Sequence, residues 1–225
     1  MLSFRRWWSR PRTPVLGVDI GVGGVRVIEL ARSGRDLQIV HYGYQSLPAG
    51  AIRDGGIVMR DEVCVALQEA LRCSGSRLRA AALALPASAV IKKIISLSAQ
   101  SSEDEVEMQV EAEAMALLPV AREEIAVDFA VLGPSTQQPH AVDVMLVAAR
   151  QEKIIERAEL AQAVGVKPVI IDIESQALLA AMHMMLSPSE IAAEHLLGAI
   201  YMDAEQAYAY FIPVSYTHLT LPTIL

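Results

Sequence analysis

Three strand-like runs lie close together near the start of the chain, with no room for a helix between them. They cover residues 15–20, 25–31 and 37–44 and are rich in residues that favour strands. Only short turns that contain glycine separate them. Parallel neighbours would need a crossover of a dozen or more residues, so consecutive strands must pair antiparallel. The sequence therefore predicts an antiparallel meander here and not a β-α-β unit.

Composition places the chain among folded proteins with a large aliphatic core. It has 225 residues, of which 53% are hydrophobic and only 5% aromatic. A chain of this length can bury a substantial core, here built mainly from Ala, Val, Leu and Ile. The 26 acidic residues outnumber the 19 Lys and Arg and give a formal net charge of −7. Because nucleic-acid binding needs a basic surface, we expect no nucleic-acid partner.

Downstream of the meander, the pattern alternates between helices and strands and restarts once. A helix is predicted over residues 61–73 and a strand over residues 81–85. From about residue 87 a separate unit begins, and from residue 166 the α/β alternation returns. The remaining predicted elements are strand 90–97, a central helix, strands 125–132 and 142–148, helix 152–164, strand 166–173, helix 175–186, a short helix and a strand pair, 199–203 and 207–212. The sequence predicts an α/β fold with an inserted unit.

The central helix of the inserted unit carries a clear start signal. Ser102 is placed to cap it, and Glu105 completes a capping box, while Pro119 ends the helix. Its predicted apolar stripe consists of Val106, Val110, Ala114 and Leu117. An acidic row at i, i+4 spacing is either a solvated surface or a docking strip for a basic partner. The members of this row are Glu103, Glu107 and Glu111.

The turn after the first strand is the motif with the most chemical content. Asp19 lies at the end of the strand, followed by glycines at positions 21, 23 and 24. Glycines let several backbone N–H groups approach one oxyanion, and a carboxylate at a strand end can hold Mg²⁺ through water. A P-loop or a dinucleotide fingerprint would need a helix next, where this chain enters a second strand. A plain tight hairpin, with Asp19 capping the turn, is the alternative.

The two cysteines and the first twelve residues each have an ordinary structural explanation. Cys64 and Cys73 are too few for a zinc site, and we expect them to pack as small apolar residues on or beside one helix. The basic and aromatic leader, residues 1–12, either contacts an anionic membrane surface or is a disordered start. It lacks the apolar run of a secretory signal, and no later run is long enough to span a bilayer. We expect a cytoplasmic protein.

Six blocks of the sequence stand in an order that one protein family shares. They are LGVDIGVGGVRVIEL (16–30), LPAGAIRDGGI (47–57), ALPASAVIKKI (84–94), SEDEVEMQVEAEAMALLP (102–119), DVMLVAARQEKI (143–154) and VIIDIESQALLAA (169–181). In this order they resemble the PilM family of type IV pilus assembly proteins. This family is similar to the cell-division protein FtsA, within the actin, Hsp70 and sugar-kinase superfamily. Residues 214–225 instead resemble a translated sequencing adapter. We expect the natural sequence to differ after about residue 213.

The resemblance implies an actin-like (ribonuclease H-like) first lobe. Subdomain 1A would comprise residues 13–86 and 166–195. A mobile α+β subdomain 1C would be inserted over residues 87–165, which agrees with the restart near residue 87. Residues 196–213 would begin subdomain 2A, part of a second lobe that is largely missing from the sequence.

The resemblance also implies a site for ATP and Mg²⁺ between the lobes. Its first phosphate loop would be formed by Asp19, Gly21, Val22, Gly23, Gly24 and Arg26. Asp19 would hold Mg²⁺ through water, Asp172 and Glu174 would lie in the segment that links the lobes, and Asp203 would lie in the second phosphate loop.

The chain departs from the family pattern in both phosphate loops. Val22, Gly23 and Gly24 stand where serines are common, and Arg26 replaces a common lysine. The second loop should be rich in glycine, yet residues 201–211 contain none, so Cβ atoms would hinder close approach of the backbone to a phosphate.

The family resemblance predicts a cytoplasmic scaffold, peripheral at the inner membrane. It would bind the cytoplasmic N-terminal tail of PilN in a groove between subdomains 1A and 1C, and would contact other pilus assembly components. We identify no catalytic base, so any ATP turnover is expected to be slow. Two alternatives stay open. One is a nucleotide-free adaptor of a related pilus or type II secretion system, and the other is an enzyme similar to sugar or acetate kinases.

Overall fold

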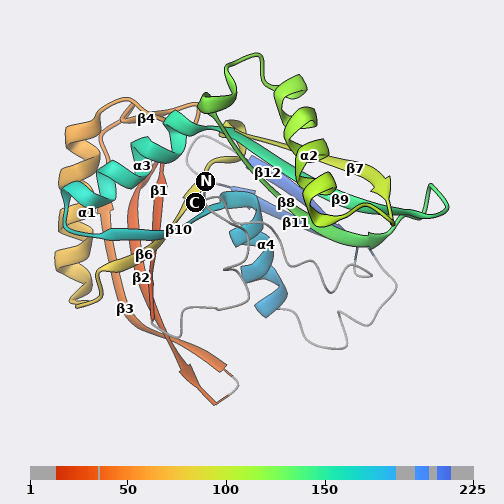
Figure 1. Cartoon of the computed structure of the whole chain (residues 1–225). Helices are drawn as coiled ribbons and strands as arrows, with labels where there is room; N and C mark the ends of the chain where they lie inside the picture. The colour runs from red at the N-terminus through yellow and green to blue at the C-terminus, as the bar shows by residue number, and fades with distance from the viewer. Residues whose placement is uncertain (1–13, 35, 186–195, 203–206, 214–225) are drawn as a thin grey trace.

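A five-stranded sheet forms the first lobe. The computed structural model describes residues 14–34, 36–185, 196–202 and 207–213. The strands are β1 (Leu16–Gly21), β2 (Gly24–Ser33), β3 (Asp36–Ser46), β6 (Ala80–Leu85) and β10 (Lys167–Ile173), and their order in the sheet is β10-β6-β1-β2-β3 (Figure 1). Strands β1, β2 and β3 pair antiparallel, whereas β6 is parallel to both β1 and β10. The predicted meander is confirmed.

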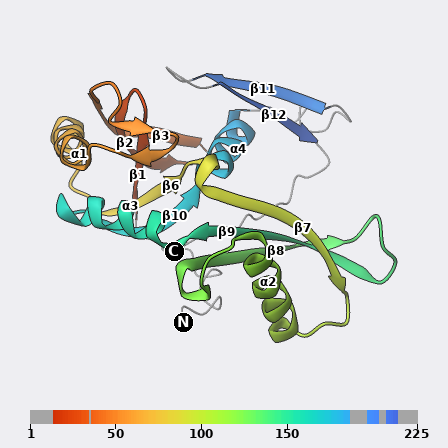
Figure 2. The ribbon, with the colours of Figure 1, turned by 90° about the horizontal axis from the view of Figure 1, so that it is seen from above.

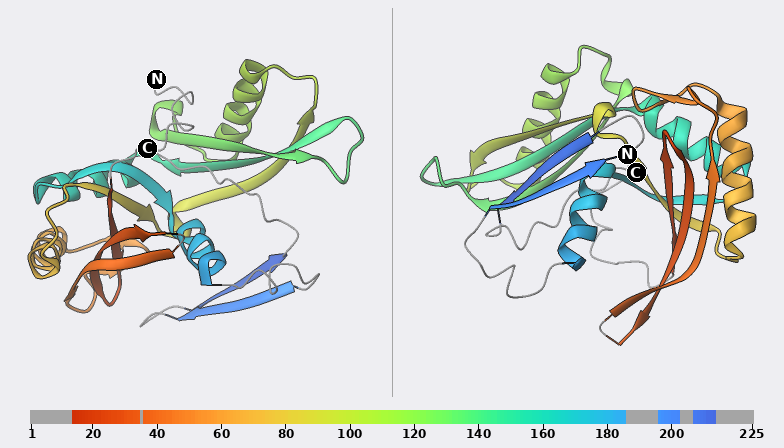
Figure 3. Two further views of the ribbon diagram at one scale, coloured as in Figure 1. Left: turned by 90° about the horizontal axis from the view of Figure 1, so that it is seen from below. Right: turned by 180° about the vertical axis from the view of Figure 1, so that it is seen from behind.

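Helices cover both sides of this sheet. Helices α1 (Arg60–Ser74) and α3 (Gln151–Ala163) pack on one face. Helix α4 (Glu174–Met185) contacts β10 and β6 on the side opposite α3 (Figures 2 and 3). The core between the sheet and the first two helices contains fully buried side chains from each, including Leu16, Leu67 and Leu160. The helices predicted over residues 61–73, 152–164 and 175–186 are confirmed, with small shifts at their ends.

Helix α1 lies unusually close to strand β3. A Cβ atom added at Gly43 would be 1.9 Å from the backbone oxygen of Ala70, so only glycine permits this approach. The helix ends at Gly75, which has φ 69° in the left-handed region.

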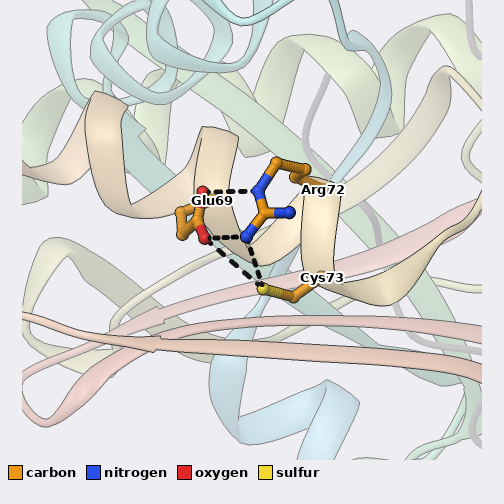
Figure 4. A network of polar contacts seen from close by, with 3 residues as sticks. All are labelled: Glu69, Arg72 and Cys73. Carbon is orange, nitrogen blue, oxygen red and sulfur yellow. Dashed lines mark hydrogen bonds and ion pairs between the residues drawn. The ribbon is translucent and has the colours of Figure 1, made fainter.

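The outer surface of α1 carries a short polar network near its C-terminal end. Arg72 donates two hydrogen bonds to the carboxylate of Glu69, and Cys73 lies beside them (Figure 4). The arginine lowers the pKa of Glu69. Cys73 is exposed, whereas Cys64 is half-buried against the first core. The expectation that both cysteines pack as apolar residues therefore holds for Cys64 and is wrong for Cys73.

A three-stranded antiparallel sheet and one helix form the insert. Its strands are β7 (Val90–Ser98), β8 (Ile125–Pro134) and β9 (Ala141–Arg150), in the order β7-β9-β8, and helix α2 (Glu103–Leu117) packs on one face (Figure 2). Short 3₁₀ turns, Ala87–Ala89 and Arg122–Glu124, precede β7 and β8. Both bonds of the predicted capping box are present between Ser102 and Glu105. In the acidic row, Glu103 and Glu107 are exposed and Glu111 pairs with Arg122.

Strand β9 joins the two sheets because both of its faces are buried. Val144, Leu146 and Ala148 pack with α2, whereas Met145, Val147 and Ala149 join the core of the five-stranded sheet. Helix α3, which follows directly, also packs in that first core. The predicted insert, residues 87–165, included this helix, whereas in the structure the helix packs against the five-stranded sheet. The numbered division into subdomains 1A and 1C stays a prediction.

Two small hairpins complete the described residues. Strands β4 (Ile52–Arg53) and β5 (Gly56–Ile57) flank a two-residue turn, and β11 (Leu196–Met202) pairs antiparallel with β12 (Ala207–Pro213). The leader (1–12), the short helix before β11, Asp203 and the adapter-like tail (214–225) lie outside the described residues. None of the helices that the structure describes is long and apolar enough to cross a bilayer.

The close approach of α1 to β3 gives a test of the packing. We expect Gly43→Ala to lower the free energy of unfolding by about 3 kcal/mol, because its new methyl meets rigid helix backbone. Gly17→Ala is the matched control, since its methyl would crowd a side-chain atom, Cγ2 of Ile28 at 2.8 Å, with the nearest backbone atom at an ordinary 3.9 Å, and it should cost about 1 kcal/mol. Urea unfolding of both variants measures the difference. Equal costs would show that the α1–β3 contact is not tight in solution.

Candidate functional site

The predicted phosphate loop is a tight hairpin turn between β1 and β2. Gly21 pairs with Gly24, so Val22 and Gly23 form the turn. Within residues 21–24, all of which the structure describes, only Gly24 has a positive φ, 155°. A Cβ atom there would lie 2.5 Å from the backbone oxygen of Gln45. The fold thus requires glycine at position 24, whereas the backbone conformation gives no such reason at positions 21 and 23.

Register between the strands brings the charged residues of the loop together. Asp19 pairs with Arg26 across the hairpin, and the guanidinium Nη1 lies 2.9 Å from the carboxylate Oδ2. Arg26 also lies 5.6 Å from the ring centre of Tyr44, whose hydroxyl donates to the backbone oxygen of Gly23 at 2.9 Å. The Tyr44 hydroxyl and the Arg26 guanidinium therefore both contact this hairpin.

Asp19 and Glu174 both line a small cavity next to the loop. It has a volume of about 20 Å³ and is lined by Asp19, Ile20, Ala84, Pro86, Arg157 and Glu174. Such a space has room for about one water molecule and none for a phosphate group. Asp19 lies on β1, and Glu174 begins α4 directly after β10; β1 and β10 lie on either side of β6. The sheet order therefore unites two residues that are far apart in sequence.

Asp172 does not share this cavity. It lies on β10 in register with Ala84 of β6, half-buried, and its Oδ1 accepts a hydrogen bond of 2.7 Å from the backbone N–H of Ile173. Burial raises the pKa of the Asp172 carboxyl, and this hydrogen bond opposes the rise. The structure therefore separates Asp172 from Glu174, although only one residue lies between them.

Sequence reasoning missed Arg157, the largest fully buried side chain among the described residues. It is 2% exposed and lies on α3, where its Nη2 donates to the backbone oxygen of Gly55 at 2.9 Å. Its Nε has no hydrogen-bond partner among the described residues. Burial lowers its pKa, while the carboxylates of Glu156 and Glu174 raise it. The available signal was its spacing, since it follows Ile154 by three residues and precedes Ala161 by four, within the apolar stripe.

The site can supply part of what a magnesium-nucleotide complex needs. No group of three or more His, Cys, Asp or Glu within the described ranges could hold a metal ion directly. Mg²⁺ commonly keeps several waters and uses one or two carboxylates together with phosphates, a role open to Asp19 and Glu174. Arg26 would compete with Mg²⁺ for the Asp19 carboxylate, because it already forms an ion pair with it.

Comparison with known proteins identifies the family. The profile described as type IV pilus assembly protein PilM matches residues 17–202, most of the chain. The chain belongs to the PilM family of type IV pilus assembly proteins.

Solved structures support the PilM assignment at the level of the fold. A PilM-PilN type IV pilus biogenesis complex matches with a TM-score of 0.76 and 24% identity, covering 95% of this chain and 62% of that chain. The cytoplasmic domain of EpsL, an inner-membrane component of the type II secretion system of Vibrio cholerae, matches with a TM-score of 0.50 and 14% identity, covering 88% and 71%. The predicted α/β, actin-like fold class is confirmed. The chain spans about 62% of the PilM structure that it matches.

The half-buried carboxyl of Asp172 predicts a pH-dependent stability. Since its pKa is raised by folding, the folded state binds more protons between the unfolded and folded pKa values, and stability falls as the pH rises through that window. Asp172→Asn removes the buried charge and keeps an oxygen for the Ile173 N–H. We expect its melting temperature to exceed that of the wild type at pH 7, with the gain disappearing toward pH 4 and below.

Asp128→Asn is the matched control, because Asp128 accepts from the backbone N–H of the following residue, Phe129, at 2.9 Å. Thermal unfolding followed by circular dichroism from pH 3.5 to pH 8 makes the comparison. An Asp172→Asn variant that is less stable than the wild type at pH 7 would contradict the assigned cost of the buried carboxylate.

Proposed function

We propose that this PilM-family chain is part of a cytoplasmic scaffold of the type IV pilus machine, peripheral at the inner membrane, that binds the N-terminal tail of PilN. The observation that carries the proposal is the family match over residues 17–202. The solved complex of PilM with PilN supports it, since the fold is shared at a TM-score of 0.76. Contacts with other assembly components and with the membrane surface belong to the same proposal.

The tail would lie in a groove between the first lobe and the insert. Two separately packed cores, one under the five-stranded sheet and one under α2, support a seam at this place. Polar contacts between described residues cross it. Lys92 of β7 donates to Ser175 at the start of α4 at 3.0 Å, and Ser88 donates to the backbone oxygen of Asp54 at 3.1 Å.

A bound nucleotide would complete the scaffold. The proposed site is the β1–β2 turn with Asp19 and Arg26, together with Glu174 across the small cavity. When bound, ATP with Mg²⁺ would add the charge that holds the two lobes together. Asp172 would support the segment that links the lobes, and Asp203 the second phosphate loop. We assign no residue to catalysis, so any hydrolysis would be slow.

Binding of a PilN tail peptide tests the scaffold proposal. We expect isothermal titration of the full-length protein to show a complex with a dissociation constant in the range of tens of micromolar or tighter. A peptide with the same composition in scrambled order is the control. No heat of binding at these concentrations, with the wild-type protein folded, would refute the proposal.

A nucleotide-free adaptor is the second candidate function. The ion pair between Asp19 and Arg26 favours it, because the carboxylate that would serve Mg²⁺ is already neutralised. The absence of glycine from residues 201–211 favours it too. Such an adaptor would bind the tail peptide and ignore ATP, so tail binding alone does not separate the two candidates.

Fluorescent mant-ATP separates the ATP-binding scaffold from the adaptor. For the scaffold we expect Mg²⁺-dependent binding by the full-length protein, weakened about tenfold or more by Asp19→Ala, which removes the magnesium carboxylate. Glu29→Ala is the control, because Glu29 lies on the same hairpin and contacts Ser76 instead. Absence of binding would select the adaptor. Binding that is unaffected by both Mg²⁺ and Asp19→Ala would instead refute the proposed role of Asp19.

A further inference from the structure

The β4–β5 turn touches both connections between the first lobe and the insert. Its central residues, Asp54 and Gly55, have φ values of 50° and 74°, as in a two-residue hairpin of type I′. This turn belongs to the first lobe by sequence, since it precedes α1. Its two consecutive backbone oxygens accept from Ser88, which precedes β7, and from Arg157, which follows β9.

The entering connection meets the first of these oxygens. Ser88, in the 3₁₀ turn that leads into β7, donates its hydroxyl to Asp54 O at 3.1 Å. The approach is tight, since a Cβ atom at Gly55 would lie 2.5 Å from Ser88 Oγ and 2.6 Å from Pro86 Cγ. Glycine is needed here for its left-handed φ and also for this contact.

The leaving connection meets the second oxygen. Strand β9 passes directly into α3, and Arg157 on that helix donates to Gly55 O at 2.9 Å. Burying a guanidinium that is only 2% exposed is costly, so each hydrogen bond to it helps to determine its position. Glu156 Oε2 lies 3.4 Å from its Nη1, and this longer contact does not fix the group.

We propose that the Asp54-Gly55 turn, Ser88 and Arg157 form a clamp that sets the orientation of the insert on the first lobe. Arg157 is its positioning residue. The same side chain lines the cavity behind the β1–β2 turn beside Asp19 and Glu174, so the clamp also connects that turn to the seam. If the seam holds the PilN tail, which rests on the proposed function, the clamp fixes the width of the groove.

Hydrogen exchange of the full 225-residue chain tests the clamp without any ligand. Two amides report on it, Ala89 N–H, bonded to Pro86 O, and Val58 N–H, bonded to Ala51 O. We expect Arg157→Met to speed exchange at both amides about tenfold or more, because opening of the turn then needs no broken bond to a buried charge. Arg157→Lys, which keeps a cationic donor, should restore part of the protection.

Arg60→Met is the matched control. Arg60 also joins α1 of the first lobe to α3, through an ion pair with Glu159 at 3.2 Å, yet both side chains are about half exposed. Removing it should leave exchange at Ala89 and Val58 unchanged. Equal acceleration in the control, or unchanged exchange in a folded Arg157→Met variant, would overturn the proposal.

Ser88→Ala tests the other half of the clamp and does not depend on the folding of the Arg157 variants. Ser88 is exposed, so its loss should not threaten the fold. We expect several-fold faster exchange at Ala89, with unchanged exchange in α2. If Arg157→Met fails to fold, unchanged protection at Ala89 in Ser88→Ala would refute the clamp. Failure of tail binding in the separate titration would leave these outcomes intact.

Discussion

The arrangement of the molecule depends on strand β9, because it is buried on both faces. Six consecutive residues, 144–149, are buried, and they alternate between the core under α2 and the core of the five-stranded sheet. Swinging the insert away from the first lobe would expose Met145, Val147 and Ala149. At the usual stabilisation from burying such side chains, that would cost several kcal/mol in total. The insert is thus anchored along β9, and movement is least costly at the seam where polar contacts replace apolar ones.

Local sequence signals were sufficient to predict most helices and strands, but they did not predict how these elements pack against one another. The meander followed from short turns, and helix α2 from the box formed by Ser102 and Glu105, because both depend on neighbours in sequence. The amphipathic stripe of α3 predicted a helix but could not say which sheet it would face. The uninterrupted apolar run of β9 is typical of a strand with two buried faces, and this signal went unused.

The same distinction explains the candidate site. Asp19 and Arg26 meet through hairpin register, so their proximity could be read from the turn length. Glu174 joins Asp19 only because β6 lies between β1 and β10, an order that follows from the whole sheet. Arg157 was hidden because a basic residue within an apolar stripe is normally expected to reach solvent along its stem. Here the backbone oxygen of Gly55 provides a partner inside the protein.

The ion pair between Arg26 and Asp19 is a weaker argument against nucleotide binding than its geometry suggests. The two side chains are 35% and 51% exposed, and exposed pairs contribute about 1 kcal/mol or less. A phosphate group next to the β1–β2 turn could therefore draw Arg26 away from Asp19 at small cost, leaving the carboxylate for hydrated Mg²⁺. The lack of glycine in residues 201–211 is a stronger argument. A Cβ atom is fixed to the backbone and cannot rotate away from a phosphate, as the end of a long side chain can. The choice between the two proposed functions thus depends more on residues 201–211, the proposed second phosphate loop, than on the β1–β2 turn.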